Sequence, residues 1–114
     1  MAEVALSPLA KADMTEIGDY ISRQLKNPGA ARRQIQRFRE AILPLGDFPE
    51  MGTPLPAPGS QGPAYRYLVC GSYMIFYHLI DASVLVDRVL YGRRDYMTLL
   101  FGKELRDAKG FEGE

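Results

Sequence analysis

The 114-residue sequence has no tryptophan, a single cysteine and no net charge. Cys70 has no partner for an intramolecular disulfide, and one cysteine excludes a zinc site built on cysteines. No apolar run approaches the roughly 18 residues of a membrane helix. Residues 1–4 lack the basic region and the apolar core that open a signal peptide. We therefore expect a cytoplasmic protein of a reducing compartment, with no membrane partner, no metal site and no cofactor.

The absence of net charge also limits the partners. Fourteen basic residues balance fourteen acidic ones, whereas nucleic-acid binders usually carry a basic excess because contacts to phosphate drive their affinity. Most of the bases are arginine, whose planar guanidinium suits phosphate and carboxylate groups. Residues 32–94 are mildly basic and the residues from Asp95 onward are mildly acidic. Neutrality therefore counts against a free-standing nucleic-acid binder.

The residues that are present form an ordinary globular composition, with 46% hydrophobic and 25% charged residues, and the length suits one domain with its own core. Ser7-Pro8 and Asn27-Pro28 each supply an N-cap followed by proline at the first helical position. Two helices joined by about two residues form an antiparallel hairpin. The apolar stripes of these helices recur at steps of three and four: Ala10, Met14, Ile17, Ile21 and Leu25, then Ala31, Ile35, Phe38, Ile42 and Leu45.

The second half of the chain changes character. Residues 47–64 are rich in proline and glycine and predict a long loop, either functional or mobile. From Tyr65 the apolar period becomes two, and residues 65–70, 73–80 and 84–91 predict three strands joined by short turns. Residues 96–101 follow as a short C-terminal helix or docking segment.

This order predicts an α+β fold. An antiparallel helical hairpin packs on one face of a curved, mostly antiparallel sheet, and a short helix ends the domain. An N-terminal strand over residues 3–6 is expected to pair parallel with the last strand, at an edge. Residues 1–102 form the single domain, and residues 103–114 form a polar tail.

Four segments together resemble the RelE/ParE superfamily of toxins from bacterial type II toxin–antitoxin modules. They are the strand that leads into Leu6-Ser7-Pro8-Leu9-Ala10, the Pro-Gly-rich loop that ends near Arg66, the run from Gly71 to Asp81, and the run from Val86 to Asp95. No one segment is specific, but their order and spacing are, over residues 2–101. The fold of that superfamily agrees with the one predicted above.

The resemblance implies a toxin that a cognate antitoxin neutralises, with growth inhibition and plasmid stabilisation as the family roles. RelE-like members are metal-independent endoribonucleases that cut mRNA on the ribosome, and they use Arg, Lys and a Tyr or His to move protons and stabilise phosphate charge. ParE-like members bind DNA gyrase and need no catalytic set. A degenerate, non-toxic member is a third reading.

The residues favour the ParE-like branch. Where the ribonuclease branch has an arginine after the tyrosine of its Gly-Tyr segment, this chain has Met74. Tyr65 and Tyr67 stand where that branch has lysines. The pair Arg93-Arg94 does match it, whereas its later tyrosine falls near Leu100 in this chain.

The resemblance also suggests site residues. We expect Arg66, Tyr91, Arg93 and Arg94 to contact the target; in a ribonuclease, Arg66, Arg93, Arg94 and Tyr96 are the catalytic candidates. Ion pairs of Arg93 and Arg94 with Asp95 or Asp87 are the alternative, as is a half-exposed strand charge for Arg66. Tyr91 and Tyr96 either stack on a base or pack.

Apolar residues near the C-terminus suggest where the antitoxin binds. Leu99, Leu100 and Phe101 are the candidates, through a helix in a groove or an added strand. The alternative is that they complete the core of the monomer. His78 is expected to be a hydrogen-bonded histidine within the sheet, and Cys70 a small buried hydrophobe.

Overall fold

The computed structural model describes residues 2–55 and 65–92. The predicted C-terminal helix and the polar tail lie outside this part. Neither described helix has the length and the apolar run that a bilayer crossing requires. The elements in chain order are β1 (Glu3–Leu6), α1 (Pro8–Asp19), a π-helical turn (Tyr20–Gln24), α2 (Pro28–Ile42), a 3₁₀ turn (Leu43–Gly46), β2 (Thr53–Leu55), β3 (Tyr65–Cys70), β4 (Tyr73–Ile80) and β5 (Ser83–Tyr91).

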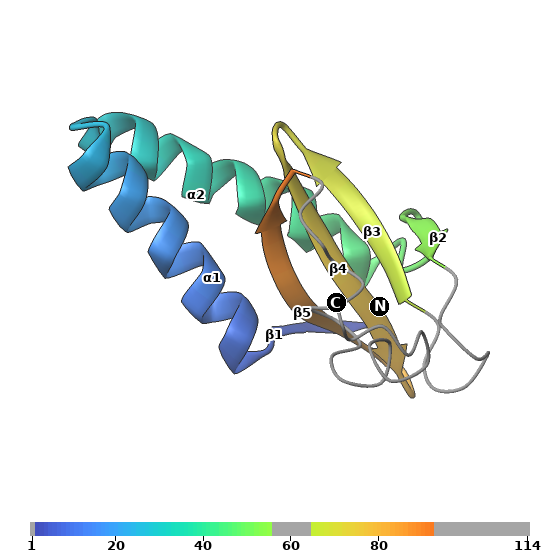
Figure 1. The fold of residues 1–114 in the computed structure, drawn as a ribbon. Coiled ribbons are helices and arrows are strands. Elements are labelled where there is room, and N and C mark those ends of the chain that lie inside the picture. Colours follow the sequence, from blue (N-terminus) through green and yellow to red (C-terminus); the bar gives the residue numbers. More distant parts are fainter. Residues whose placement is uncertain (1, 56–64, 93–114) are drawn as a thin grey trace, which may run out of the picture.

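The described elements confirm the α+β class. The two helices lie side by side as a hairpin against one face of a bent sheet (Figure 1). The strand order is β1-β5-β4-β3-β2, so β4 is central, as predicted. The edge strand β1 runs parallel to β5, whereas β2 to β5 pair antiparallel along the chain.

Both helices begin where the cap signals predicted. Ser7 Oγ accepts the Ala10 N–H at 2.9 Å, and Asn27 Oδ1 accepts the Ala30 N–H at 3.0 Å. Each bond satisfies one of the backbone donors that a helix start leaves unpaired. The cap residues therefore set the two starting points of the hairpin.

The end of the first helix differs from the prediction, which continued the α-helix to Leu25. The chain widens into a π-helical turn after Asp19, and the Leu25 N–H bonds to the Tyr20 carbonyl five residues earlier at 3.2 Å. Within this turn Ile21 stays buried, whereas Leu25, the last residue of the predicted stripe, is 57% exposed. Tyr20, at the start of the turn, is 55% exposed.

The predicted loop over residues 47–64 contains a short strand that the sequence analysis missed. Thr53–Leu55 pairs with Tyr65–Tyr67 of β3 at the edge of the sheet. Three residues around Pro54 are too few to show a period of two, and proline is tolerated in a strand only at an edge, where its missing N–H is not needed. The prediction of an unbroken loop was therefore wrong for these residues.

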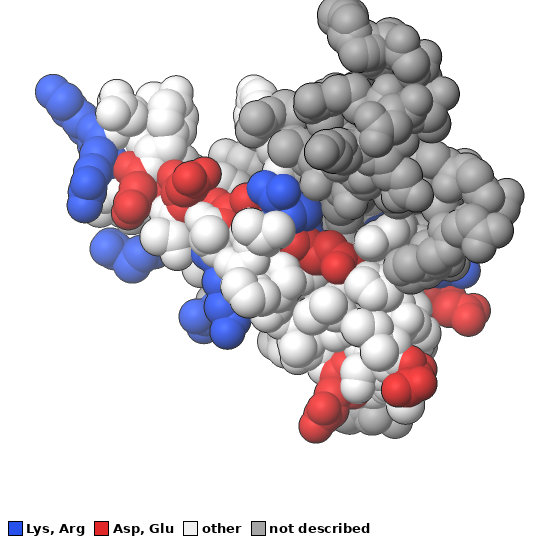
Figure 2. All heavy atoms as spheres, turned by 60° about the horizontal axis from the view of Figure 1, so that its bottom comes forward, with Lys and Arg blue, Asp and Glu red and all other residues white. Residues whose placement is uncertain are grey.

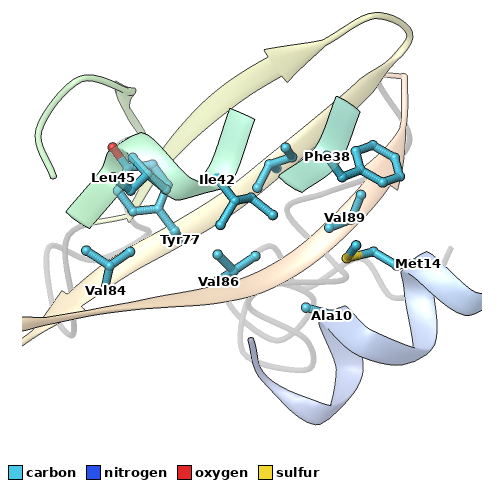
Figure 3. Close-up of a cluster of buried hydrophobic side chains, with 10 residues drawn as sticks. Ala10, Met14, Phe38, Ile42, Leu45, Tyr77, Val84, Val86 and Val89 are labelled. Carbon is cyan, nitrogen blue, oxygen red and sulfur yellow. The ribbon is translucent and has the colours of Figure 1, made fainter. Parts of the chain in front are cut away.

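The core lies between the helices and the sheet. Its fully buried members include Phe38, Tyr77 and Val86, and Figure 3 shows how the side chains of α1, α2, β4 and β5 meet there. A second apolar cluster involves no helical residue. It consists of Leu55, Phe76 and Leu90, with Tyr65, Tyr67 and Met74 packed against them. Because successive strand residues point to opposite faces, this second cluster marks the sheet face away from the helices, here called the distal face.

Candidate functional site

Two of the predicted site residues, Arg66 and Tyr91, lie in the described part of the chain. The others fall outside it: Arg93, Arg94, Tyr96, Leu99, Leu100 and Phe101. Arg66 pairs with Tyr77, near the start of β3, whereas Tyr91 pairs with Tyr73, which faces Cys70 at the end of β3. Four residues of strand place the two about 13 Å apart along the strand direction. They belong to different ends of the sheet and do not form one site.

Arg66 is held by the backbone that precedes β2. Its Nη1 donates to the Glu50 carbonyl at 3.1 Å and to the Gly52 carbonyl at 2.8 Å. Beside it, the buried Tyr77 hydroxyl accepts the Gly52 N–H at 2.9 Å and donates to the Pro49 carbonyl at 2.8 Å. Burial raises the pKa of Tyr77, so the hydroxyl keeps the proton that it donates. This end of the sheet therefore fastens the segment between α2 and β2.

The strands carry few cations. Arg66 and Arg88 are the only lysine or arginine residues in the five described strands. On the face in Figure 2, basic side chains gather toward the helical turn, whereas acidic ones are spread more widely. The distal face instead presents Tyr65, Tyr67 and Met74, all half-buried. Within the described residues, the sheet thus offers an aromatic and apolar surface rather than a phosphate-binding one.

Arg88 is neutralised by a residue that the sequence analysis missed, Asp13 of α1. Its Nε and Nη2 donate to the two Asp13 carboxylate oxygens at 2.8 and 2.9 Å, and the Val89 N–H also donates to Asp13, at 2.9 Å. The hydrogen bond to Asp13 raises the pKa of Arg88, with burial acting in the opposite direction. β1 pairs with β5 only as far as Val86, so Asp13 supplies a backbone acceptor where the neighbouring strand ends. The sequence did hold a signal for this role, because Asp13 stands directly before Met14 of the predicted apolar stripe.

The second buried polar group joins His78 to Asp87. His78 Nδ1 lies 2.7 Å from Asp87 Oδ2, and the Tyr65 ring packs edge-on against the imidazole at 5.1 Å. This confirms the expected hydrogen-bonded histidine within the sheet. Burial raises the pKa of Asp87, while the hydrogen bond and charge of His78 lower it less. No group of three or more His, Cys, Asp and Glu side chains that could hold a metal exists among the described residues.

The raised pKa of Asp87 predicts a pH dependence of stability. Because the folded state holds the proton more tightly than the unfolded chain, this contribution is full below the ordinary pKa of 3.8 and is lost as the pH rises through the folded pKa. In the Asp87→Asn variant the side-chain amide does not titrate. Urea titrations at several pH values give the unfolding free energy of both proteins. The value for the wild type minus that for the variant should fall as the pH rises from 3.8 through the folded pKa of Asp87. Asp81→Asn, at an exposed turn, is the control, and a flat or rising difference contradicts the prediction.

A groove lies between the helical hairpin and the far end of the sheet. Its volume is about 830 Å³, and it is lined by Tyr20, Ile21 and Leu25 of the π-helical segment, by Arg33, Gln34 and Arg37 of α2, and by Tyr73 and Tyr91 of the sheet, among others. The Tyr73 and Tyr91 rings meet edge to face at 5.5 Å, and Tyr91 is 60% exposed. The groove therefore has aromatic side chains from the sheet on one side and two guanidinium groups from α2 on the other. Tyr91, a predicted site residue, is one of its lining residues. Tyr20 and Leu25 line the groove from the two ends of the π-helical turn, which the sequence analysis did not predict.

Comparison with known proteins agrees with this architecture. A family model described as the ParE toxin of the type II toxin–antitoxin system parDE matches residues 4–96. A solved structure titled "Chromosomal ParDE TA system from P. aeruginosa" is similar with a TM-score of 0.68 and 20% identity, over 82% of this chain and 98% of that chain. At that identity the likeness shows a shared fold. No curated protein matches the sequence.

Proposed function

The chain belongs to the family of ParE toxins of type II toxin–antitoxin systems, and from this premise we propose that it arrests bacterial growth by binding DNA gyrase until a cognate antitoxin neutralises it. Its action on gyrase is that of a binding protein, with no reaction of its own. The cytoplasm, where that target works, is its proposed location.

The observation that supports a protein target is the chemistry of the distal face. Cleavage of RNA needs cations beside the phosphate to stabilise the charge that develops there. Among the described residues of that face, the partly exposed side chains are Tyr65, Tyr67 and Met74, which pack over the buried Phe76. Arg88, whose backbone pairs with Phe76, has its guanidinium committed to Asp13. Aromatic and methionine side chains are enriched in the buried centres of protein interfaces, which this face matches.

The groove supports the proposal that an antitoxin covers the toxin. Exposed Tyr20, Leu25 and Tyr91 line it beside Arg33 and Arg37, a combination that suits an amphipathic segment with acidic side chains. Leu99, Leu100 and Phe101 remain the proposed antitoxin contacts in the sequence beyond the described residues. Residues 1–102 remain the proposed toxin domain.

The order in which macromolecular syntheses stop tests this proposal. On induction without antitoxin, incorporation of labelled thymidine should fall before incorporation of labelled amino acids, because a blocked gyrase stops replication first. Pulse labelling at successive times after induction measures both. An uninduced culture and a culture that also expresses the antitoxin are the controls.

Translation that fails first would instead support ribosome-dependent mRNA cleavage, the candidate that the Arg93-Arg94 pair favours. Normal growth with the folded protein present would identify a family member that has lost its toxicity. Each outcome therefore selects one of the three readings that the sequence left open.

A further inference from the structure

The segment between α2 and β2 presents two apolar side chains to solvent. Phe48 is 64% exposed and Met51 is 51% exposed, and with Pro49 and Glu50 they line a shallow hollow. Single exposed hydrophobic residues are ordinary. The feature that distinguishes this pair is the way in which the backbone beneath it is held.

Two side chains of the sheet, Tyr77 and Arg66, hold that backbone by hydrogen bonds, although they lie 14 to 28 residues away in the sequence. Tyr77 bonds to Gly52 and Pro49, and Arg66 bonds to Glu50 and Gly52. The Tyr77 hydroxyl, red in Figure 3, lies at the end of the main core cluster, so this anchor is part of the core itself. Met51 is held locally, because its N–H donates to the Phe48 carbonyl at 3.1 Å. Every residue from 49 to 52 therefore has a backbone group in a hydrogen bond.

The close approach at Gly52 shows how tightly the segment is seated. A Cβ atom at this position would lie 2.6 Å from the Tyr77 hydroxyl oxygen and 2.8 Å from the Tyr67 carbonyl oxygen. Both distances are too short for a real contact, and the second involves backbone, which cannot swing aside. Only glycine allows the segment to lie this close to the sheet.

An ordered backbone that displays unburied apolar side chains has its conformational entropy already reduced before any partner arrives. Such preorganisation strengthens binding because less freedom is lost on association. Asp47 and Glu50 are the charged residues of the segment, and both are exposed. Electrostatic complementarity then calls for basic groups on the partner.

We propose that residues 47–52 form a preorganised knob whose Phe48 and Met51 side chains enter an apolar pocket, rimmed by basic residues, on the target protein of this toxin. This proposal rests on the proposed function. It concerns the target rather than the antitoxin, because the exposed acids Asp47 and Glu50 are opposite in charge to the arginines of the groove proposed for the antitoxin. Arg66 is then a positioning residue. It acts on the target through the knob, by holding the Glu50 and Gly52 carbonyls.

Binding of purified DNA gyrase to the immobilised toxin tests the knob. The double variant Phe48→Ala/Met51→Ala should bind at least tenfold more weakly than the wild type, because truncating an apolar anchor removes the largest contributions to an interface. Leu9→Ala is the matched control. Leu9 is 58% exposed and belongs to α1, not to residues 47–52, and its loss should leave the affinity unchanged. The melting temperatures of all three proteins should agree, since every side chain removed is exposed.

Arg66→Ala separates positioning from direct contact. The variant should weaken gyrase binding, and hydrogen exchange at the Gly52 amide should become faster. Added to the double variant, Arg66→Ala should cause no further loss of affinity, because residues that act through one element are not additive. Additive losses would show that Arg66 touches the target independently and would overturn its positioning role.

Two results overturn the knob. One is wild-type affinity in the Phe48→Ala/Met51→Ala variant, and the other is an equal loss of affinity in Leu9→Ala. A wild-type protein that neither binds gyrase nor stops DNA synthesis overturns the proposed function together with the knob, and the wild-type measurement alone identifies that case.

Discussion

Replacing Asp13 by alanine should lower the free energy of unfolding by about 3–5 kcal/mol, because removing one partner leaves the other charge of a largely buried ion pair unpaired. Side-chain exposure is only 10% for Asp13 and 17% for Arg88. The same change removes the acceptor of the buried Val89 N–H near the end of β5. Since small domains are stable by only about 5–15 kcal/mol, this variant should be close to unfolded at 37 °C. Urea denaturation followed by circular dichroism measures the loss.

Three further variants separate the contributions. Asp19→Ala removes an exposed acid of the same helix and should change stability by less than about 0.5 kcal/mol. Asp13→Asn keeps an acceptor for the Val89 N–H and should recover part of the loss. The double variant Asp13→Leu/Arg88→Met removes both charges and should be more stable than Asp13→Ala, because an apolar pair leaves no buried charge unpaired. A loss in Asp13→Ala no greater than in Asp19→Ala would contradict the role assigned to the pair.

The second large effect concerns Arg93 and Arg94. Replacing both by alanine should abolish growth arrest on induction while the domain stays folded, because the proposed target contact depends on their guanidinium groups. They follow Gly92, whose left-handed φ of 58° and 2.6 Å N–H bond to the Ser72 carbonyl end β5. Counts of viable cells after induction, with the level of folded protein measured in parallel, test the prediction.

The conservative variant Arg93→Lys/Arg94→Lys is the control for this pair. Lysine keeps the charge but cannot form the two parallel hydrogen bonds of a guanidinium, so a partial loss of toxicity is expected. An alanine variant that fails to fold would support the alternative that the pair makes ion pairs within the chain. Full toxicity of the alanine variant would remove both residues from the target contact.

The two predictions differ in how far each rests on tertiary structure. Arg93 and Arg94 were predicted from the sequence, through their place in a resemblance that covers nearly the whole chain. The role of Asp13 was not predicted, because its partners Arg88 and Val89 lie in β5 and only the folded structure brings that strand beside α1. Arg66 was predicted from the sequence to contact the target, but its bonds to Glu50 and Gly52 could not be predicted there.

The sequence alone determined the α+β class, the helix starts at Ser7 and Asn27, the three main strands and the parallel edge strand. These features depend on caps and on periods of 3.6 and 2, which are properties of neighbouring residues. The tertiary structure decided which polar groups meet. Asp13 reaches Arg88 across 75 positions, and the irregular pairing between Phe76 and Tyr77 helps to set where the β5 side chains fall. Such contacts depend on the register and on the edge of a folded sheet, and no local pattern in a single sequence encodes either.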